Sequence, residues 1–161
     1  MRMGMGLRKS VVLATAVGGL MVLAPAMAAD SAFSGLAGSW GGGGNVKFTD
    51  GSSERMRCNA RYSGGASDVS LSINCAGSAH NIDLTGRLHA NGGHVSGSWN
   101  ETNLGVSGSA SGKSSPGHLS LGLGGGVSGS MSVSFSGSHQ DVAISVSGVA
   151  LESVSMSLGK H

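Results

Sequence analysis

Apolar and polar residues alternate along most of this chain. The segment from Val95 to Asn100, Val-Ser-Gly-Ser-Trp-Asn, shows the pattern, and nearly every segment after residue 35 repeats it. Because successive side chains of a β-strand point to opposite faces, a period of two indicates strands with one buried face. The same region has no apolar repeat of 3.6 residues, so no helix is predicted there. The pattern predicts ten strands, at residues 36–49, 53–63, 69–76, 79–89, 94–100, 105–113, 117–123, 127–137, 140–148 and 151–159.

The connections between these strands are short and contain turn signals such as Asp50-Gly51, Gly64-Gly65 and Asn91-Gly92. Short connections join antiparallel neighbours, so the strands should follow one another as a meander. One face of each strand is apolar, and the other is small and polar. A sheet of this kind would expose two edges unless it closed. We therefore predict an all-β fold, an antiparallel meander that forms a closed or nearly closed β-barrel, with a curled β-sandwich as the alternative.

The two cysteines, Cys58 and Cys75, test the register of neighbouring strands. If Tyr62 lies opposite Leu71, the apolar residues of both strands share a face and Cys58 lies opposite Cys75. Directly opposed residues of a non-hydrogen-bonded pair are close enough for a disulfide. The pattern and a disulfide therefore require the same register, and the bond should stabilise the fold by roughly 3 kcal/mol. A two-cysteine metal site is the alternative, but no histidine stands at zinc-finger spacing.

The predicted turn positions also give the pairing of residues in the next three pairs of strands. A turn at Gly77-Ser78 pairs Ile73 with Ile82 and Leu71 with Leu84. A turn at Asn91-Gly92 pairs Leu88 with Val95, Gly86 with Gly97 and Leu84 with Trp99. A turn at Thr102-Asn103 pairs Trp99 with Val106, Gly97 with Gly108 and Val95 with Ala110. In this register Gly86, Gly97 and Gly108 lie side by side on the apolar face, next to Trp99.

Such a row of glycines has two interpretations. Glycine within a strand often marks the close approach of another group. That group is either an indole of the protein itself, from Trp99 or Trp40, or a small apolar ligand. In the second case, the glycines would form the floor of a shallow binding pocket and Trp99 its wall.

The first 28 residues have the pattern of a secretory signal peptide. A basic start with Arg2, Arg8 and Lys9 precedes the apolar run Val11–Leu23, which is followed by small residues ending at Ala28. We expect cleavage there, or one residue later. This leaves a single all-β domain, residues 29–161, that is periplasmic or secreted. The apolar run is too short for a membrane span of about 20 residues, so the protein is not expected to span the membrane. An outer-membrane barrel is the alternative, but the chain lacks two aromatic girdles.

Composition and charge change this picture little. Glycine contributes 30 of the 161 residues and serine is equally frequent, a bias that often marks linkers. The even spacing of apolar residues between the serines nevertheless favours a folded domain. Loss of residues 1–28 would remove three of the ten Lys and Arg residues and leave seven against eight acidic residues. The charge therefore gives no reason to expect a nucleic acid as partner.

Two short motifs, Gly38-Ser39-Trp40 and Gly97-Ser98-Trp99, read Gly-x-Trp. The first, soon after Phe33, resembles the Gly-x-Trp of lipocalin- and avidin-like barrels. That resemblance implies a meander barrel with a small ligand inside, although those families have eight strands; no binding residue is carried over. The chain also resembles small exported bacterial proteins of unassigned function, through the segments Asp50–Cys58 and Gly97–Glu101. This resemblance supports export and the disulfide but implies no function.

Two groups of polar side chains are candidates for binding. Arg55, Arg57 and Arg61 share the polar face of one strand and could bind a sulfated or phosphorylated glycan or an acidic partner. Alternatively they are solvated, with an arginine paired to Asp83 across an intervening serine. His89 and His94 would oppose each other beside the Asn91-Gly92 turn. A metal site needs a third ligand, which is not evident, so no metal or cofactor is predicted.

No catalytic motif is present. Serine and histidine are frequent enough that a Ser-His-Asp set could be drawn many ways, and no nucleophile elbow, phosphate loop or dinucleotide fingerprint occurs. We therefore predict no enzyme activity. The primary interpretation is an exported, non-catalytic barrel that is a binding or envelope-associated structural module for a glycan or another envelope component. The alternatives are a small apolar-ligand carrier with a pocket beside Trp99 and, last, a secreted hydrolase.

Overall fold

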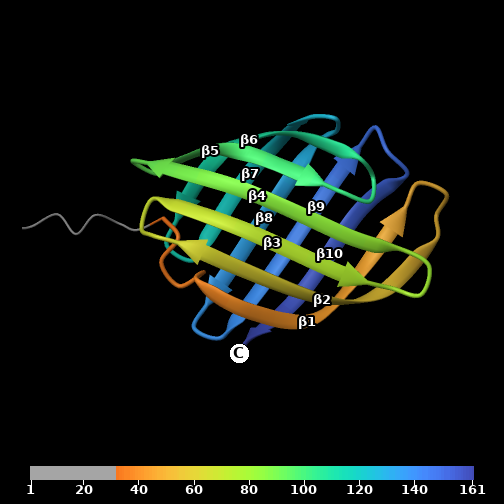
Figure 1. Cartoon of the computed structure of the whole chain (residues 1–161), viewed down its shortest axis with the longest axis horizontal. Coiled ribbons are helices and arrows are strands. Elements are labelled where there is room, and N and C mark those ends of the chain that lie inside the picture. The colour runs from red at the N-terminus through yellow and green to blue at the C-terminus, as the bar shows by residue number, and fades with distance from the viewer. Residues whose placement is uncertain (1–31) are drawn as a thin grey trace, which may run out of the picture.

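The computed structural model describes residues 32–161, and the predicted signal peptide at residues 1–28 lies outside this range. The described chain forms ten antiparallel strands, each hydrogen-bonded to the next, and β1 pairs with β10 to close a barrel (Figure 1). The predicted all-β meander barrel is confirmed, and the sheet closes fully. The strands are β1 (Gly38–Phe48), β2 (Ser53–Gly64), β3 (Asp68–Ala76), β4 (Asn81–Asn91), β5 (His94–Glu101), β6 (Val106–Ser115), β7 (His118–Gly125), β8 (Ser128–Ser136), β9 (His139–Ser147) and β10 (Leu151–Lys160).

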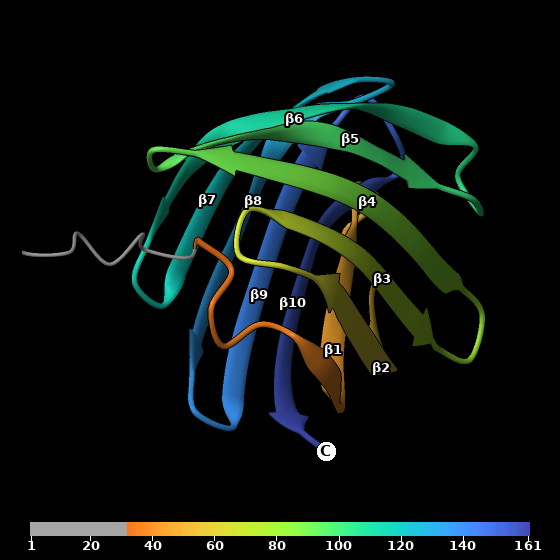
Figure 2. The ribbon, with the colours of Figure 1, turned by 60° about the vertical axis from the view of Figure 1, so that its left-hand side comes forward.

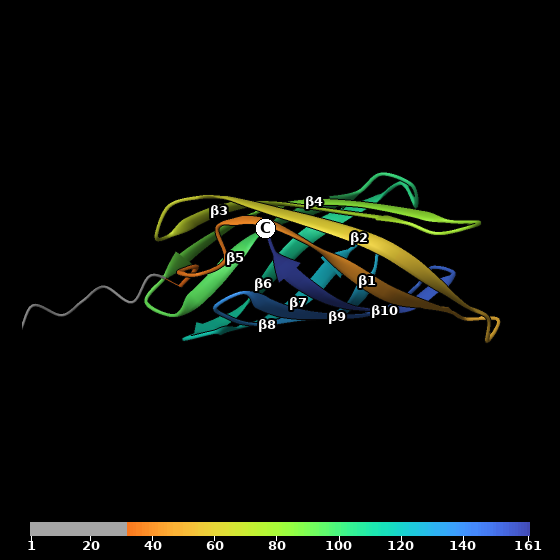
Figure 3. The ribbon, with the colours of Figure 1, turned by 90° about the horizontal axis from the view of Figure 1, so that it is seen from below.

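The barrel is flattened. Strands β2 to β5 cross in front of β7 to β10 in Figure 1, and the view from below in Figure 3 shows two walls close together. Figure 2 shows the same two walls from the side, with the strands of one inclined to those of the other. Strands of a closed barrel tilt relative to its axis, so strands on opposite walls cross. The flattening brings the apolar faces of the two walls into contact.

The apolar face of every strand points into this interior. Residues predicted to face inward are buried, among them Ile73, Leu119, Val133, Val154 and Leu158. The serines that alternate with them in β8, β9 and β10 lie on the outer surface, mostly exposed. The predicted sidedness is therefore correct, with the apolar face turned inward and the serine face outward.

The segment before β1 closes one end of the barrel. The side chains of Phe33 and Leu36 are buried, and the Trp40 indole N–H donates to the Leu36 carbonyl at 2.8 Å. Lys160 Nζ donates to the Gly35 carbonyl at 3.2 Å and lies 5.1 Å from the centre of the Trp40 ring. We refer to residues 32–37 as the N-terminal plug. Trp40 therefore packs against the plug rather than over the glycines near Trp99.

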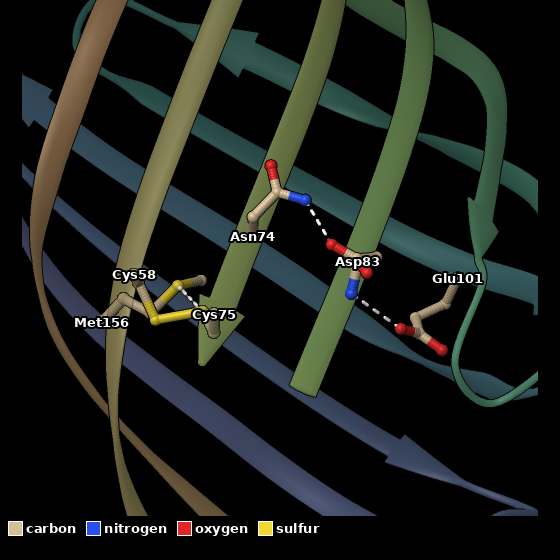
Figure 4. The surroundings of a disulfide bond; sticks show 6 residues. All are labelled: Cys58, Asn74, Cys75, Asp83, Glu101 and Met156. Atoms are coloured by element: carbon tan, nitrogen blue, oxygen red, sulfur yellow. Dashed lines mark hydrogen bonds between the residues drawn. A yellow bond between two sulfur atoms is a disulfide. The ribbon is translucent and has the colours of Figure 1, made fainter. Parts of the chain in front are cut away.

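The disulfide joins β2 to β3 in the predicted register. Cys58 lies opposite Cys75, and Tyr62 lies opposite Leu71. Both sulfurs are buried beside Met156, whose Sδ lies 3.6 Å from the Cys75 sulfur (Figure 4). A Cβ at Gly44 of β1 would lie only 3.0 Å from the Cys58 sulfur. The absence of that Cβ lets β1 pass close over the disulfide, which explains one of the consecutive glycines in this strand.

The register predicted for the next pair of strands is wrong by two residues. Ile73 lies opposite Leu84, not Ile82, and Leu71 lies opposite Gly86, not Leu84. The reason is a four-residue loop, residues 77–80, in place of a two-residue turn. Glu54 at the start of β2 holds this loop: its carboxylate accepts from Ala79 N–H at 2.7 Å and interacts with His80 Nδ1 at 2.8 Å. We refer to this arrangement as the Glu54 clamp.

The β4–β5 turn also lies one residue beyond the predicted position. Gly92 and Gly93 form the two-residue loop, with φ of 58° and 83°, and Asn91 pairs with His94. A type I′ turn requires positive φ at both central positions, and two glycines adopt it without the penalty that a Cβ imposes on asparagine. This one-residue shift of the turn moves the pairing by two: Leu88 lies opposite Gly97, not Val95.

The predicted row of three glycines does not form. Gly86 lies opposite Trp99, and Trp99 lies opposite Gly108, so the tryptophan has a glycine on each side. Gly97 lies instead between Leu88 and Ala110. The predicted pairing of Trp99 with Leu84 is wrong because of the same shift of the β4–β5 turn. The predicted pairings of Trp99 with Val106 and of Val95 with Ala110 are wrong because residues 102–105 form a four-residue loop and Glu101 pairs with Val106.

The position of Gly97 gives a test of the corrected register. A Cβ there would meet the backbone oxygen of Arg87 and would lie 2.9 Å from Cδ2 of Leu88. We expect Gly97→Ala to lower the free energy of unfolding by about 1–3 kcal/mol, the usual cost of overpacking. Gly122→Ala is the matched control, because its Cβ would have only the Ser111 oxygen nearby, at 3.6 Å. Urea denaturation measures both; equal stabilities would contradict this register.

The Glu54 clamp predicts a dependence of stability on pH. The hydrogen bond from Ala79 N–H, followed by that from His80, lowers the pKa of the Glu54 carboxyl from 4.5 to about 2. A carboxyl with a lowered pKa in the folded state stabilises the fold above its ordinary pKa and loses that effect as the pH falls toward the lowered value. We expect Glu54→Gln to destabilise the protein at pH 6 and the difference from wild type to shrink between pH 4.5 and pH 2. Urea unfolding at several pH values checks this; a difference that stays constant would refute the clamp.

Candidate functional site

Outward-facing polar residues form two parallel rows around the barrel, from β2 through β1, β10, β9 and β8 to β7. One row runs Arg57, Gly43, Ser157, Asp141, Ser134 and His118. The other runs Arg55, Asn45, Ser155, Ala143, Ser132 and Ser120. Neighbouring strands are about 4.8 Å apart, and each row presents polar side chains on five of its six strands, the exceptions being Gly43 in one row and Ala143 in the other.

A groove of about 680 Å³ follows these rows over β8, β9, β10, β1 and β2. We call it the serine groove, and its polar lining comprises Asn45, Arg55, Ser132, Ser134, Asp141, Ser155 and Ser157. Gly43 lies at its centre, and a Cβ there would meet no atom within 4 Å. The groove is therefore open where β1 carries no side chain. The groove is shallow and largely open to solvent.

Opposite charges lie near the two ends of the serine groove. Arg55 is on β2, and Asp141 is on β9, three strands further around the barrel and in the other row. The Ser157 hydroxyl donates to Asp141 Oδ1, and His139 Nε2 lies 3.1 Å from Oδ2. The hydrogen bond from Ser157, with the nearby His139, holds the pKa of the Asp141 carboxyl below its ordinary value. The groove therefore offers a fixed anion at β9 and a cation at β2, with hydroxyl groups between them.

These residues are not ordered like a catalytic triad. A serine nucleophile needs a base that accepts its proton, with a third group orienting that base. Here Asp141 lies between Ser157 and His139, so the serine donates to a carboxylate with a lowered pKa. A second histidine–serine contact joins His118 Nδ1 to Ser134 Oγ at 3.1 Å. Within the described part of the chain, no acidic side chain hydrogen-bonds to His118 to orient it. The arrangement is suited to holding hydroxyl groups rather than to activating one.

The three predicted arginines share the exposed face of β2, as expected, but they do not line one groove. Arg55 lines the serine groove, and Arg57 stands in the adjacent row, but Arg61 lies apart, opposite Ser72. The predicted pairing of an arginine with Asp83 across Ser72 is wrong, because Ser72 lies opposite Thr85. Asp83 instead accepts a hydrogen bond from the Asn74 amide (Figure 4).

The predicted pocket beside Trp99 corresponds to an apolar cavity of about 70 Å³ inside the barrel. Trp99 and Gly86 line it, as expected, whereas Gly97, Gly108 and Trp40 do not. The Trp99 indole N–H donates to the Ser109 carbonyl on β6 at 3.0 Å. The indole thus points toward β6, where Gly108 lies opposite Trp99.

The predicted pair of histidines is separated. His89 lies opposite Ser96 rather than His94, and its Nδ1 is 2.8 Å from the Asp68 carboxylate. That contact holds the pKa of Asp68 below its ordinary value. Within residues 32–161, no three histidine, cysteine or acidic side chains converge on a possible metal position.

Two buried polar groups were not predicted from the sequence. Glu101 accepts hydrogen bonds from the Asp83 and Leu104 amides, and Figure 4 shows the first of them. Gln140 is fully buried, and its amide donates to the Tyr62 hydroxyl at 3.0 Å; burial raises the pKa of Tyr62 to about 12. Both residues occupy inward positions of the period-two pattern, which could have identified them.

No family model and no curated protein matches this chain. Among solved structures, the crystal structure of Rv2717c from M. tuberculosis is similar in fold, with a TM-score of 0.68 and 18% sequence identity. The match covers 86% of this chain and 99% of that one. No helix in the described residues is long and apolar enough to cross a membrane. The comparison identifies a shared barrel fold, and at this level of identity nothing more.

Proposed function

We propose that this protein is an exported, non-catalytic binding module and that the serine groove binds a glycan of the cell envelope. The observation that carries the proposal is the groove itself, a volume of about 680 Å³ lined by serine, asparagine, arginine and aspartate on the outer wall of the barrel. The signal-like first 28 residues and the disulfide both favour an oxidising compartment outside the cytoplasm.

The chemistry of the lining favours a ligand rich in hydroxyl groups. Each serine hydroxyl both donates and accepts, Arg55 only donates, and ionised Asp141 only accepts. A sugar hydroxyl can satisfy any of these partners. An anionic substituent, such as a sulfate, would pair with Arg55 through charge-assisted hydrogen bonds.

A protein partner fits this surface less well. Protein interfaces are centred on buried aromatic or apolar anchors. Among the described residues, Leu104 is the only exposed large apolar side chain, and it does not line the serine groove. The exposed side chains of the groove are polar apart from Ala143, and such a surface favours a glycan over a protein partner.

Binding can be tested with the protein purified after export. We expect a glycan array to show preferential binding of anionic glycans, and titration calorimetry to show binding of a heparin-derived tetrasaccharide. Gly43→Gln should weaken this binding at least tenfold, because the new side chain occupies the open centre of the groove without a clash. Gly122→Gln is the matched control, on the outer face but away from the groove, and should change the affinity less than twofold.

A second pair of variants separates site binding from general attraction of charge. Arg55→Gln and Arg61→Gln remove the same charge from the same strand, but only Arg55 lines the groove. We expect at least a tenfold loss for Arg55→Gln and a small loss for Arg61→Gln, since a hydrogen bond to a charged group contributes about 1.5–3 kcal/mol. Equal losses in both variants, or no glycan bound at millimolar concentration, would overturn the proposal.

A further inference from the structure

We infer that the barrel interior holds a second, independent site, which takes an apolar molecule of about three heavy atoms. The site is the cavity of about 70 Å³ near Trp99, between the two walls of the barrel. This inference does not depend on the serine groove, which lies on the outer surface.

The wall of the cavity is apolar almost throughout. Its lining includes Leu84, Leu88, Leu121, Leu123, Met131 and Ile144. Glu101 is the single ionisable group in the lining, and both of its oxygens are occupied. They accept hydrogen bonds from Asp83 N–H at 2.8 Å and from Leu104 N–H. With that carboxylate satisfied, the wall offers little to hold water, and cavities of this kind stay dry and accept apolar guests.

Two neighbours of Trp99 shape the cavity. Gly86 on β4 lies directly opposite Trp99 and contributes no side chain, and Leu71 of β3 lies 3.3 Å from where a Gly86 Cβ would be. On the other side, the indole is held toward β6 by its hydrogen bond to the Ser109 carbonyl. The tryptophan therefore forms one wall of the space rather than filling it.

The lining of the cavity reaches one end of the barrel. The N-terminal plug closes the opposite end with the buried side chains of Phe33 and Leu36. At the open end, the lining includes residues of three loops: Leu104 between β5 and β6, Val127 between β7 and β8, and Val149 between β9 and β10. Leu104 is 41% exposed although it lines the cavity, so it stands where a guest would enter.

The volume limits the guest. An apolar cavity of about 150 Å³ accepts benzene or xenon. The cavity here is about half that size, which leaves room for xenon or dichloromethane but not for benzene. Ordinary carrier sites of about 300–1,000 Å³ are several times larger, so the class of ligand is a small volatile or gaseous apolar molecule.

Methyl-labelled NMR of the full chain under xenon pressure tests this site. We expect saturable shifts confined to lining methyl groups such as those of Leu84, Leu121 and Leu123, and no response to benzene. Ala110→Leu adds three carbons to a lining residue and should abolish the xenon shifts. Ala76→Leu, the same change at an exposed position of β3 that lines neither site, is the control and should leave them unchanged.

A variant with a larger cavity tests the same site in the opposite direction. Leu84→Ala removes three carbons from the wall and should allow benzene to bind, with shifts of the Leu121 and Leu123 methyl groups. The inference is overturned if xenon shifts are absent or spread over the whole core, if Ala110→Leu keeps them, or if Leu84→Ala rejects benzene. Glycan binding by the serine groove would be unaffected by any of these results.

Discussion

The structure depends on one constraint: every strand must turn its apolar face inward, because the chain has few large apolar residues with which to build a core. Side chains alternate along a strand, so a shift of one residue would move the whole apolar set to the solvent face. In β10, for example, Val154, Met156 and Leu158 are buried, while Ser155 and Ser157 between them are exposed. Closure of the sheet gives all ten strands the same interior and leaves no edge exposed.

That constraint also explains which parts of the fold could be predicted from the sequence. The period of two identified the strands, their faces and the meander, because burial of the apolar face determines all three. The disulfide added one exact pairing, Cys58 with Cys75, which is correct. For the strands after β3, the length and position of each loop decide which residues of neighbouring strands lie opposite each other. A two-residue turn and a four-residue loop both keep the apolar faces together, so the pattern cannot distinguish them.

The candidate sites show the consequence of this ambiguity. Trp99 and Gly86 were correctly expected to lie beside an apolar space, because both are inward positions near the middle of their strands. Gly97 was wrongly placed there, because the β4–β5 and β5–β6 pairings each differ by two residues from the predicted ones. The serine groove could not be predicted, since its position depends on the pairing of β1 with β10, the closing contact of the barrel. Nothing in the local sequence indicates that pairing.

The alternation that builds the barrel also separates its two proposed sites. A strand such as β9 presents Asp141 to the serine groove and Ile144 to the inner cavity, with a single layer of backbone between them. Side chains on the outer face can change without altering the core volume, and side chains of the core can change without altering the outer polar rows. The disulfide joins β2 to β3, and the Glu54 clamp joins β2 to the β3–β4 loop. Together they fix the position of β2, the strand that carries Arg55. Polar recognition outside and apolar packing inside are therefore independent properties of the same sheet.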